Sequence, residues 1–216
     1  MKHNVINRLA LAICAAAALT ASLTACVPLV LGGAAAGTAL VVTDRRTSGA
    51  QLEDEGIELR AASRIRNTLG TRVRINLTSY NRQVLLTGEV PNTQDKQLVE
   101  QVVSGVDNVM SVVNELAVLS SPSLMERSSD VLLSGRVKAL ILDARDLQLN
   151  AFKVVTERGT VYLMGRVTQR EADRATAIAR GLSGVQKVVR IFDLISEDEL
   201  RVLQPGLQKA QSAPTL

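Results

Sequence analysis

Two eight-residue stretches, QVLLTGEV (83–90) and TVYLMGRV (160–167), align position for position and place Gly88 opposite Gly165. A second pair follows in the same order, because SGVDNVMSVVNEL (104–116) matches SGVQKVVRIFDLI (183–195). Two matched motifs in one order and at similar separation indicate a duplication. Since two copies are too few for a solenoid, each copy is expected to close its own hydrophobic core. The chain therefore contains two copies of one small domain.

Each copy shows the same succession of local patterns. An amphipathic stretch predicts a first helix, two alternating runs around a short turn predict a hairpin, and a second helix and a β-rich run follow. In the second hairpin, Val161, Leu163 and Val167 should share one buried face of the sheet, alternating with Tyr162, Met164 and Arg166. The second helix of this copy begins at TQRE (168–171), which has the spacing of a capping box. The order α-β-β-α-β predicts an α+β fold in which each copy is a two-layer sandwich with a three-stranded sheet. The expected first helices are 56–69 and 130–142, and the expected hairpins are 75–90 and 153–167.

Gly88 and Gly165 interrupt strand patterns, which is typical of a bulge or of a close approach by a helix. The acidic clusters EDE (53–55) and EDE (197–199) are interpreted as solvated surface. SSPSLMERSS (120–129) is rich in serine and proline and is expected to link the two copies.

The first 26 residues have the pattern of an export signal. Lys2 and Arg8 give it a positive start, and LALAICAAAAL (9–19) is an apolar segment shorter than the roughly 20 residues that span a bilayer. LTAC (23–26) resembles the lipobox of bacterial lipoproteins, in which the cysteine receives a diacylglycerol. Cys26 is therefore the expected lipidation site, and the alternative is an ordinary cleavable signal with a chance cysteine. VPLVLGGAAAGTALVV (27–42) is expected to be a spacer, because sixteen residues also fall short of a span.

Composition limits the chemistry that the mature chain can perform. Cys14 and His3 lie in the signal and Cys26 would be acylated, so no free thiol and no histidine remain. Ser–His and Cys–His catalysis and most zinc sites are thereby excluded, and we expect no catalytic residue, no metal and no cofactor. Loss of Lys2 and Arg8 lowers the basic count from 25 to 23 against 21 acidic residues. With no basic block and only two Tyr and two Phe, a nucleic-acid partner is not expected.

The aliphatic residues around Gly88 and Gly165, each followed by a helix and SGV, resemble the BON domain. Two such domains behind a lipobox resemble the dual BON-domain outer-membrane lipoproteins of the DolP-like family, which are related to OsmY-type BON proteins. The resemblance covers nearly the whole mature chain, and it implies a non-enzymatic protein anchored in the outer membrane and facing the periplasm. It further implies binding of anionic phospholipid by the second domain, support of envelope integrity, and links to the β-barrel assembly machinery and the division site. A monomer is expected. The expected divisions are a signal peptide over 1–25, the lipidated cysteine with a small-residue linker over 26–50, BON domains over 51–119 and 130–197, the linker over 120–129, and a C-terminal tail over 198–216.

The stretch DVLLSGRVKALIL (130–142) carries the candidate site. Helical periodicity predicts that Leu133, Val137, Leu140 and Ile141 form its buried stripe. The opposite arc is apolar with a cation at each edge, which suits insertion into an anionic membrane interface. The predicted lipid-binding residues are Val131, Leu132, Gly135, Arg136, Lys138, Ala139 and Leu142.

The matching helix of the first copy should turn polar residues outward, so that only the second domain exposes an apolar strip. These outward residues are Arg60, Ser63, Arg64 and Asn67. Two alternatives stay open: the first domain or the linker covers the strip, or the strip binds a polypeptide, as in a periplasmic adaptor or chaperone.

Overall fold

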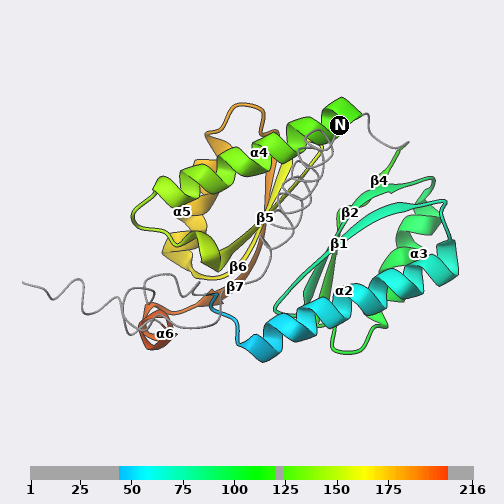
Figure 1. The fold of residues 1–216 in the computed structure, drawn as a ribbon, viewed down its shortest axis with the longest axis horizontal. Helices are drawn as coiled ribbons and strands as arrows, with labels where there is room; N and C mark the ends of the chain where they lie inside the picture. The colour runs from blue at the N-terminus through cyan, green and yellow to red at the C-terminus, as the bar shows by residue number, and fades with distance from the viewer. Residues whose placement is uncertain (1–43, 120–123, 204–216) are drawn as a thin grey trace, which may run out of the picture. The chain divides into compact units, whose positions relative to one another are not determined.

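The computed structural model describes residues 44–119 and 124–203, and Cys26 with the spacer 27–42 lies outside them. The first copy contains an antiparallel hairpin, β1–β2, and a parallel third strand that is split into β3 and β4, both paired with β2. Helices α2 and α3 pack against one face of this sheet (Figure 1). Its elements are α2 (Ser48–Leu69), β1 (Arg74–Tyr80), β2 (Gln83–Val90), α3 (Thr93–Ser104), β3 (Ser111–Asn114) and β4 (Ala117–Val118).

The second copy repeats the plan. Its sheet has the order β5-β6-β7, with β5 antiparallel and β7 parallel to the central strand, and α4 and α5 contribute to one core on a single face. The predicted α+β fold and the α-β-β-α-β order are confirmed in both copies. The elements are α4 (Leu124–Asp143), a 3₁₀ turn η1 (Leu149–Ala151), β5 (Phe152–Glu157), β6 (Thr160–Thr168), α5 (Gln169–Arg180), β7 (Lys187–Ile195) and α6 (Glu197–Leu203).

Several boundaries differ from those expected. Helix α2 begins at Ser48, where the hydroxyl of Thr47 accepts a hydrogen bond from the Ala50 N–H, so the last residues of the expected linker 26–50 are ordered. Helix α4 begins at Leu124 and takes in residues 124–129 of the expected linker. The expected tail is helical from Glu197 to Leu203 and buries Leu200. Helices α2 and α4 thus begin earlier than the amphipathic patterns that predicted them, and α6 is a helix that no pattern predicted.

The central strand of the second domain is buried on both faces. Val161, Leu163 and Val167 lie in the core under α4 and α5, which confirms the predicted face. On the other face, Tyr162 and Met164 belong to a separate apolar cluster whose buried members also include Tyr80, Leu85 and Ile191. The helix-free face of each sheet thus contributes to one shared apolar cluster. The outer surfaces of the helices take no part in this cluster.

Gly88 and Gly165 mark close approaches of neighbouring backbone. A Cβ added at Gly88, which has φ +113°, would lie 2.1 Å from the carbonyl oxygen of Arg74 on β1. A Cβ added at Gly165 would lie 2.4 Å from the carbonyl oxygen of Ala151. Of the two expected explanations, the close approach by a helix is wrong, because the neighbour is the backbone at the start of the paired strand. A bulge is also wrong at Gly88, since β1 and β2 pair residue for residue through it.

A buried aspartate in the second turn of each first helix holds the following hairpin turn. The carboxylate of Asp130 accepts hydrogen bonds from the backbone N–H groups of Arg158 (2.7 Å) and Gly159 (2.9 Å). Asp54 does the same for the N–H groups of Asn81 (2.7 Å) and Arg82 (2.8 Å). The interpretation of residues 53–55 as solvated surface is therefore wrong at Asp54, which is buried.

The start of α5 has the predicted capping box, in which Thr168 accepts from the Glu171 N–H and Glu171 accepts from the Thr168 N–H. Arg45 adds two further bonds to the Glu171 carboxylate, at 2.7 and 2.8 Å, although it lies ahead of the first domain in sequence. Burial by itself raises the pKa of Glu171, but the hydrogen bonds from Arg45 and the Thr168 backbone outweigh it and hold that pKa below its usual value. The segment before α2 is thus joined to the second domain by a buried ion pair.

Candidate functional site

Helix α4 exposes the apolar strip that its sequence predicts. Val131, Leu132 and Leu142 are 72%, 64% and 69% exposed, and Gly135 and Ala139 are exposed between them. The opposite side of the helix enters the core through Leu133, Val137 and Ile141. Nothing in the described part of the first domain covers the strip.

The prediction is wrong for one residue of the expected buried stripe. Leu140 was expected to face the core with Val137 and Ile141, but its side chain is 41% exposed. It lies next to Ala139 and three residues from Val137, so it falls at the border of the two faces. Leu140 therefore widens the apolar strip.

The cations of the strip are available to a ligand. Arg136 and Lys138 are both exposed, and neither has an acidic partner within the residues that the structure describes. By contrast, Arg170 and Arg174 of α5 lie within 4 Å of the Asp146 carboxylate. Unpaired cations beside apolar side chains give α4 the chemistry of a helix that binds an anionic interface.

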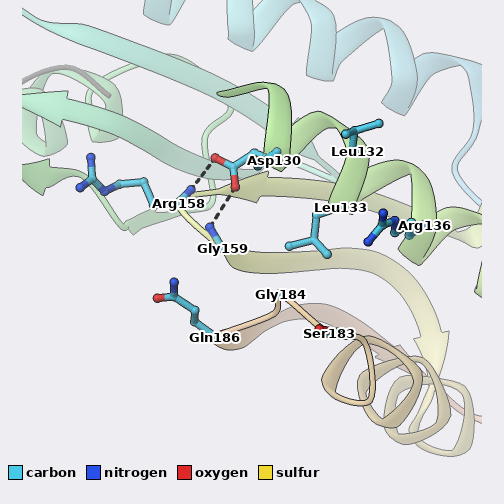
Figure 2. Close-up of a pocket in the computed structure, with 10 residues that line it drawn as sticks. Asp130, Leu132, Leu133, Arg136, Arg158, Gly159, Ser183, Gly184 and Gln186 are labelled. Carbon is cyan, nitrogen blue, oxygen red and sulfur yellow. Dashed lines mark hydrogen bonds between the residues drawn. The ribbon is translucent and has the colours of Figure 1, made fainter. Parts of the chain in front are cut away.

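A cavity of about 620 Å³ opens beside the first half of this strip. Figure 2 shows Leu133 pointing toward Gly184 across the cavity, whereas Leu132 lies on the other side of the helix. Both oxygens of Asp130 already accept hydrogen bonds from the turn. The lining residues are Ser129, Asp130, Leu132, Leu133, Arg136, Arg158, Gly159, Ser183, Gly184 and Gln186.

The first helix of the other copy presents a different surface. Ser63, Arg64 and Asn67 are exposed as predicted, and Arg60 is half-buried in an ion pair with Glu53. The expectation that only the second domain exposes apolar side chains on this helix is wrong. Helix α2 exposes Leu52 and Leu59, at 71% and 72%. Helical periodicity places both leucines beside Ser63 on the outward arc, so their exposure was predictable from the sequence.

Residues 44–119 and 124–203 contain no group of three or more His, Cys, Asp or Glu side chains placed to hold a metal ion. No helix within the same ranges is long and apolar enough to cross a membrane. The strip on α4 with its cavity is therefore the candidate site, and the leucines on α2 form a second exposed apolar feature.

Comparisons with known proteins identify relatives of this chain. The family model described as BON domain matches residues 54–120 and 129–194. The chain is 39% identical to the "Outer membrane lipoprotein DolP" of Haemophilus influenzae over 176 residues, which cover 80% of this chain and 90% of that protein. It is 29% identical to the "21 kDa hemolysin" of Actinobacillus pleuropneumoniae, over 70% of this chain and 79% of that one. It is also 30% identical to the "Osmotically-inducible protein Y" of Escherichia coli, over 53% and 58% of the two chains.

Proposed function

Because this chain belongs to the BON-domain family and is similar to the outer-membrane lipoprotein DolP over most of its length, we propose that it is an outer-membrane lipoprotein whose second BON domain binds anionic phospholipid. The lipid contact is the strip on α4. The observation that carries this proposal is an exposed apolar surface, including Val131, Leu132 and Leu142. Beside it lie Arg136 and Lys138, which have no acidic partner among the described residues.

The energetics suit a protein that is already tethered to the membrane. Each methylene that enters the hydrocarbon contributes about 0.8 kcal/mol, and each cation near an anionic leaflet contributes about 1 kcal/mol. A few leucine and valine side chains with two cations therefore give weak binding on their own. A diacylglyceryl group on Cys26 would raise the local concentration of the strip at the lipid surface, so that weak binding suffices.

The cavity beside the strip supports the same proposal. Arg136 lies at its wall, and the exposed loop residues Ser183 and Gly184 lie across from α4. An arginine with free donors recognises phosphate oxygens well. In this arrangement Leu132 and Leu142 enter the interface while Arg136 and Lys138 meet phosphates.

The cellular role that we propose rests on the resemblance to dual BON-domain lipoproteins. The protein faces the periplasm, supports the integrity of the outer membrane, and works alongside the β-barrel assembly machinery and at the division site. It acts without catalysis and as a monomer. The surface on α4 keeps the second domain in contact with the lipid while the rest of the protein engages its partners.

Vesicle flotation tests the lipid contact. The chain from residue 26 onward carrying Cys26→Ala should float with vesicles that contain phosphatidylglycerol and not with phosphatidylcholine alone. Leu132→Glu should abolish flotation without changing the circular dichroism, because it places a carboxylate in the exposed strip. The matched control is Leu59→Glu on α2, which alters an equally exposed leucine outside the strip and should float normally.

Equal flotation by the Leu132→Glu protein would remove the strip from the proposal. If the wild-type chain binds no vesicle but its α4 amide resonances shift with an unfolded polypeptide, the strip serves a periplasmic adaptor or chaperone instead. A separate experiment tests the anchor: Cys26→Ala in cells should leave the protein unlipidated and outside the outer-membrane fraction. A wild-type protein that fractionates as a soluble periplasmic species would contradict the anchor.

A further inference from the structure

The outer edge of β1 has a defined hydrogen-bonding register. Tyr80 pairs with Gln83 across the two-residue turn, so these two residues exchange backbone hydrogen bonds. In an antiparallel ladder the bonded residues alternate, and the residues between them point their N–H and C=O groups to the outer edge. Ser79 fits this register, because its N–H leaves the ladder and donates to the carboxylate of Glu58 on α2 at 2.8 Å. By the same alternation Ile75 and Leu77 direct their backbone groups outward.

No strand covers this edge within the part of the chain that the structure describes, where β1 is the first strand of the order β1-β2-β3. Glu58 covers the Ser79 position, and we find no corresponding side-chain bond to the Ile75 or Leu77 backbone among the described residues. Natural proteins protect such edges or use them for pairing with another chain. The unprotected part of β1 is the part around Ile75 and Leu77.

A cavity of about 540 Å³ lies along that same part of the edge, between β1 and α2. Leu59 forms its rim and is 72% exposed, and Leu52 lies two helical turns earlier on α2 and is 71% exposed. Glu55 is exposed, and no cation contacts its carboxylate among the described residues. The lining residues are Glu55, Glu58, Leu59, Ala62, Ile75, Asn76 and Leu77.

We propose that this edge of the first domain is a docking site for an extended polypeptide segment of another protein, which joins the sheet as a strand beside β1. Only an extended polypeptide supplies N–H and C=O groups in the alternation that the backbone of Ile75 and Leu77 requires. An aliphatic side chain of that segment enters the cavity against Leu59, and a lysine or arginine meets Glu55. The site lies in the other domain from the lipid-binding strip and has the opposite charge, so the two surfaces select different partners.

The second copy carries different chemistry at the equivalent positions. Pairing Asp54 with Asp130 places Leu59 opposite Gly135 and Ala62 opposite Lys138. At the position of Glu58 the second domain has Ser134, whose hydroxyl bonds to the hydroxyl of Thr156 on β5. Glu58 itself is engaged by the Ser79 N–H and by Lys153, so the groups offered to a basic, aliphatic strand are Leu59 and Glu55. The second domain has Gly135 and Val131 at these two positions.

A short synthetic peptide tests the site without lipid. The probe is an acetylated and amidated peptide of alternating lysine and valine that matches the seven residues of β1. It is added to the chain from residue 26 onward carrying Cys26→Ala, and the amide resonances and hydrogen exchange of the protein are followed by NMR. The proposal expects shifts centred on Ile75 and Leu77, with exchange of their amides slowed about tenfold or more.

A modified peptide and two protein variants separate strand pairing from attraction by charge or by apolar surface. The same peptide with N-methyl groups at alternate residues keeps its side chains but loses one row of donors, and it should not bind. Leu59→Lys should weaken the peptide about tenfold through a lost contact and added repulsion, whereas Leu132→Lys on α4 should leave its affinity unchanged.

Equal binding by the methylated peptide, shifts centred on α4, or the absence of any shift would each overturn the proposal. Sedimentation of the free protein as a dimer joined through β1 would also overturn it, because the edge would then belong to a second copy. These outcomes are independent of vesicle flotation, so the docking site and the lipid contact can fail separately.

Discussion

Helices α2 and α4 occupy equivalent places in the two domains. Asp54 on α2 and Asp130 on α4 each accept hydrogen bonds from both backbone N–H groups of the following hairpin turn. With these aspartates paired, Ile57, Ala61 and Ile65 of α2 correspond to Leu133, Val137 and Ile141 of α4, and all six are buried. The face that packs on the sheet is thus the same in both copies.

The exposed faces of the two helices have diverged. At the positions where α4 exposes Leu140 and Leu142, α2 exposes Arg64 and Arg66. At the position of Val131, α2 has Glu55. Packing restricts only the buried face, so duplication leaves the outer face free to acquire a different partner in each copy. This divergence supports the two proposals, that α4 meets lipid and that α2 borders a site for a polypeptide.

The largest expected effect comes from breaking what the two copies share. Leu86 and Leu163 hold equivalent positions on the two central strands, and both are fully buried. Replacing either one with Ala should lower the free energy of unfolding by roughly 2–5 kcal/mol, through lost transfer energy and the cavity that remains. Urea unfolding followed by circular dichroism measures both losses. A loss below 1 kcal/mol for one variant would show that its strand is not packed as the structure has it.

The two turn-holding aspartates should differ in how much they stabilise the fold. Asp54 receives hydrogen bonds from the Ser79 hydroxyl and the Arg46 guanidinium in addition to the turn, whereas Asp130 receives those of the turn. Because hydrogen bonds to a charged group contribute about 1.5–3 kcal/mol, Asp54→Ala should cost roughly 2–4 kcal/mol and Asp130→Ala somewhat less. Urea titration of both variants measures the difference. A larger cost for Asp130→Ala would reverse the ranking that we infer from the contacts.

Acid should remove part of the stability that Asp54 provides. Burial alone raises the pKa of Asp54, but hydrogen bonds from Ser79, the turn backbone and Arg46 outweigh it and lower that pKa below the usual value. The contribution is therefore complete above the unfolded pKa of about 4 and is lost as the pH falls through the lower folded pKa. The stability difference between wild type and Asp54→Asn should be constant from neutral pH to about 5 and shrink below about 4. A difference that grows in acid would contradict this sign.

The features that sequence alone predicts are those that a local pattern determines. The hairpins and the Thr168–Glu171 capping box follow from residues within a few positions of one another, and both are confirmed. The exposed strip on α4 also follows from helical periodicity. Leu140 was misassigned because periodicity places the border of a face only to within one residue, whereas packing in three dimensions decides it.

The features that sequence did not predict depend on partners far along the chain. In the sequence Asp54 is one of three adjacent acidic residues, yet its carboxylate accepts hydrogen bonds from the turn of the following hairpin. Arg45 lies in an expected linker and pairs with Glu171 in the other domain. The proposed docking edge of β1 is likewise apparent only in three dimensions, where α2 lies beside the strand. Such pairings leave no periodic signal in the sequence, because the residues next to each partner do not determine which residues pair.

The smallest expected effect sharpens the comparison between the outer faces of α4 and α2. Arg136→Ser and Lys138→Ser should each weaken binding to phosphatidylglycerol vesicles by about 1 kcal/mol, and the loss should shrink as salt is raised because the contribution is electrostatic. The control is Arg66→Ser, which removes an equally exposed cation at the α2 position that corresponds to Leu142. If net charge alone drew the protein to the membrane, all three variants would lose the same affinity at each salt concentration. If α4 is the contact, only the first two should lose affinity, since their apolar neighbours hold them within a Debye length of the phosphates.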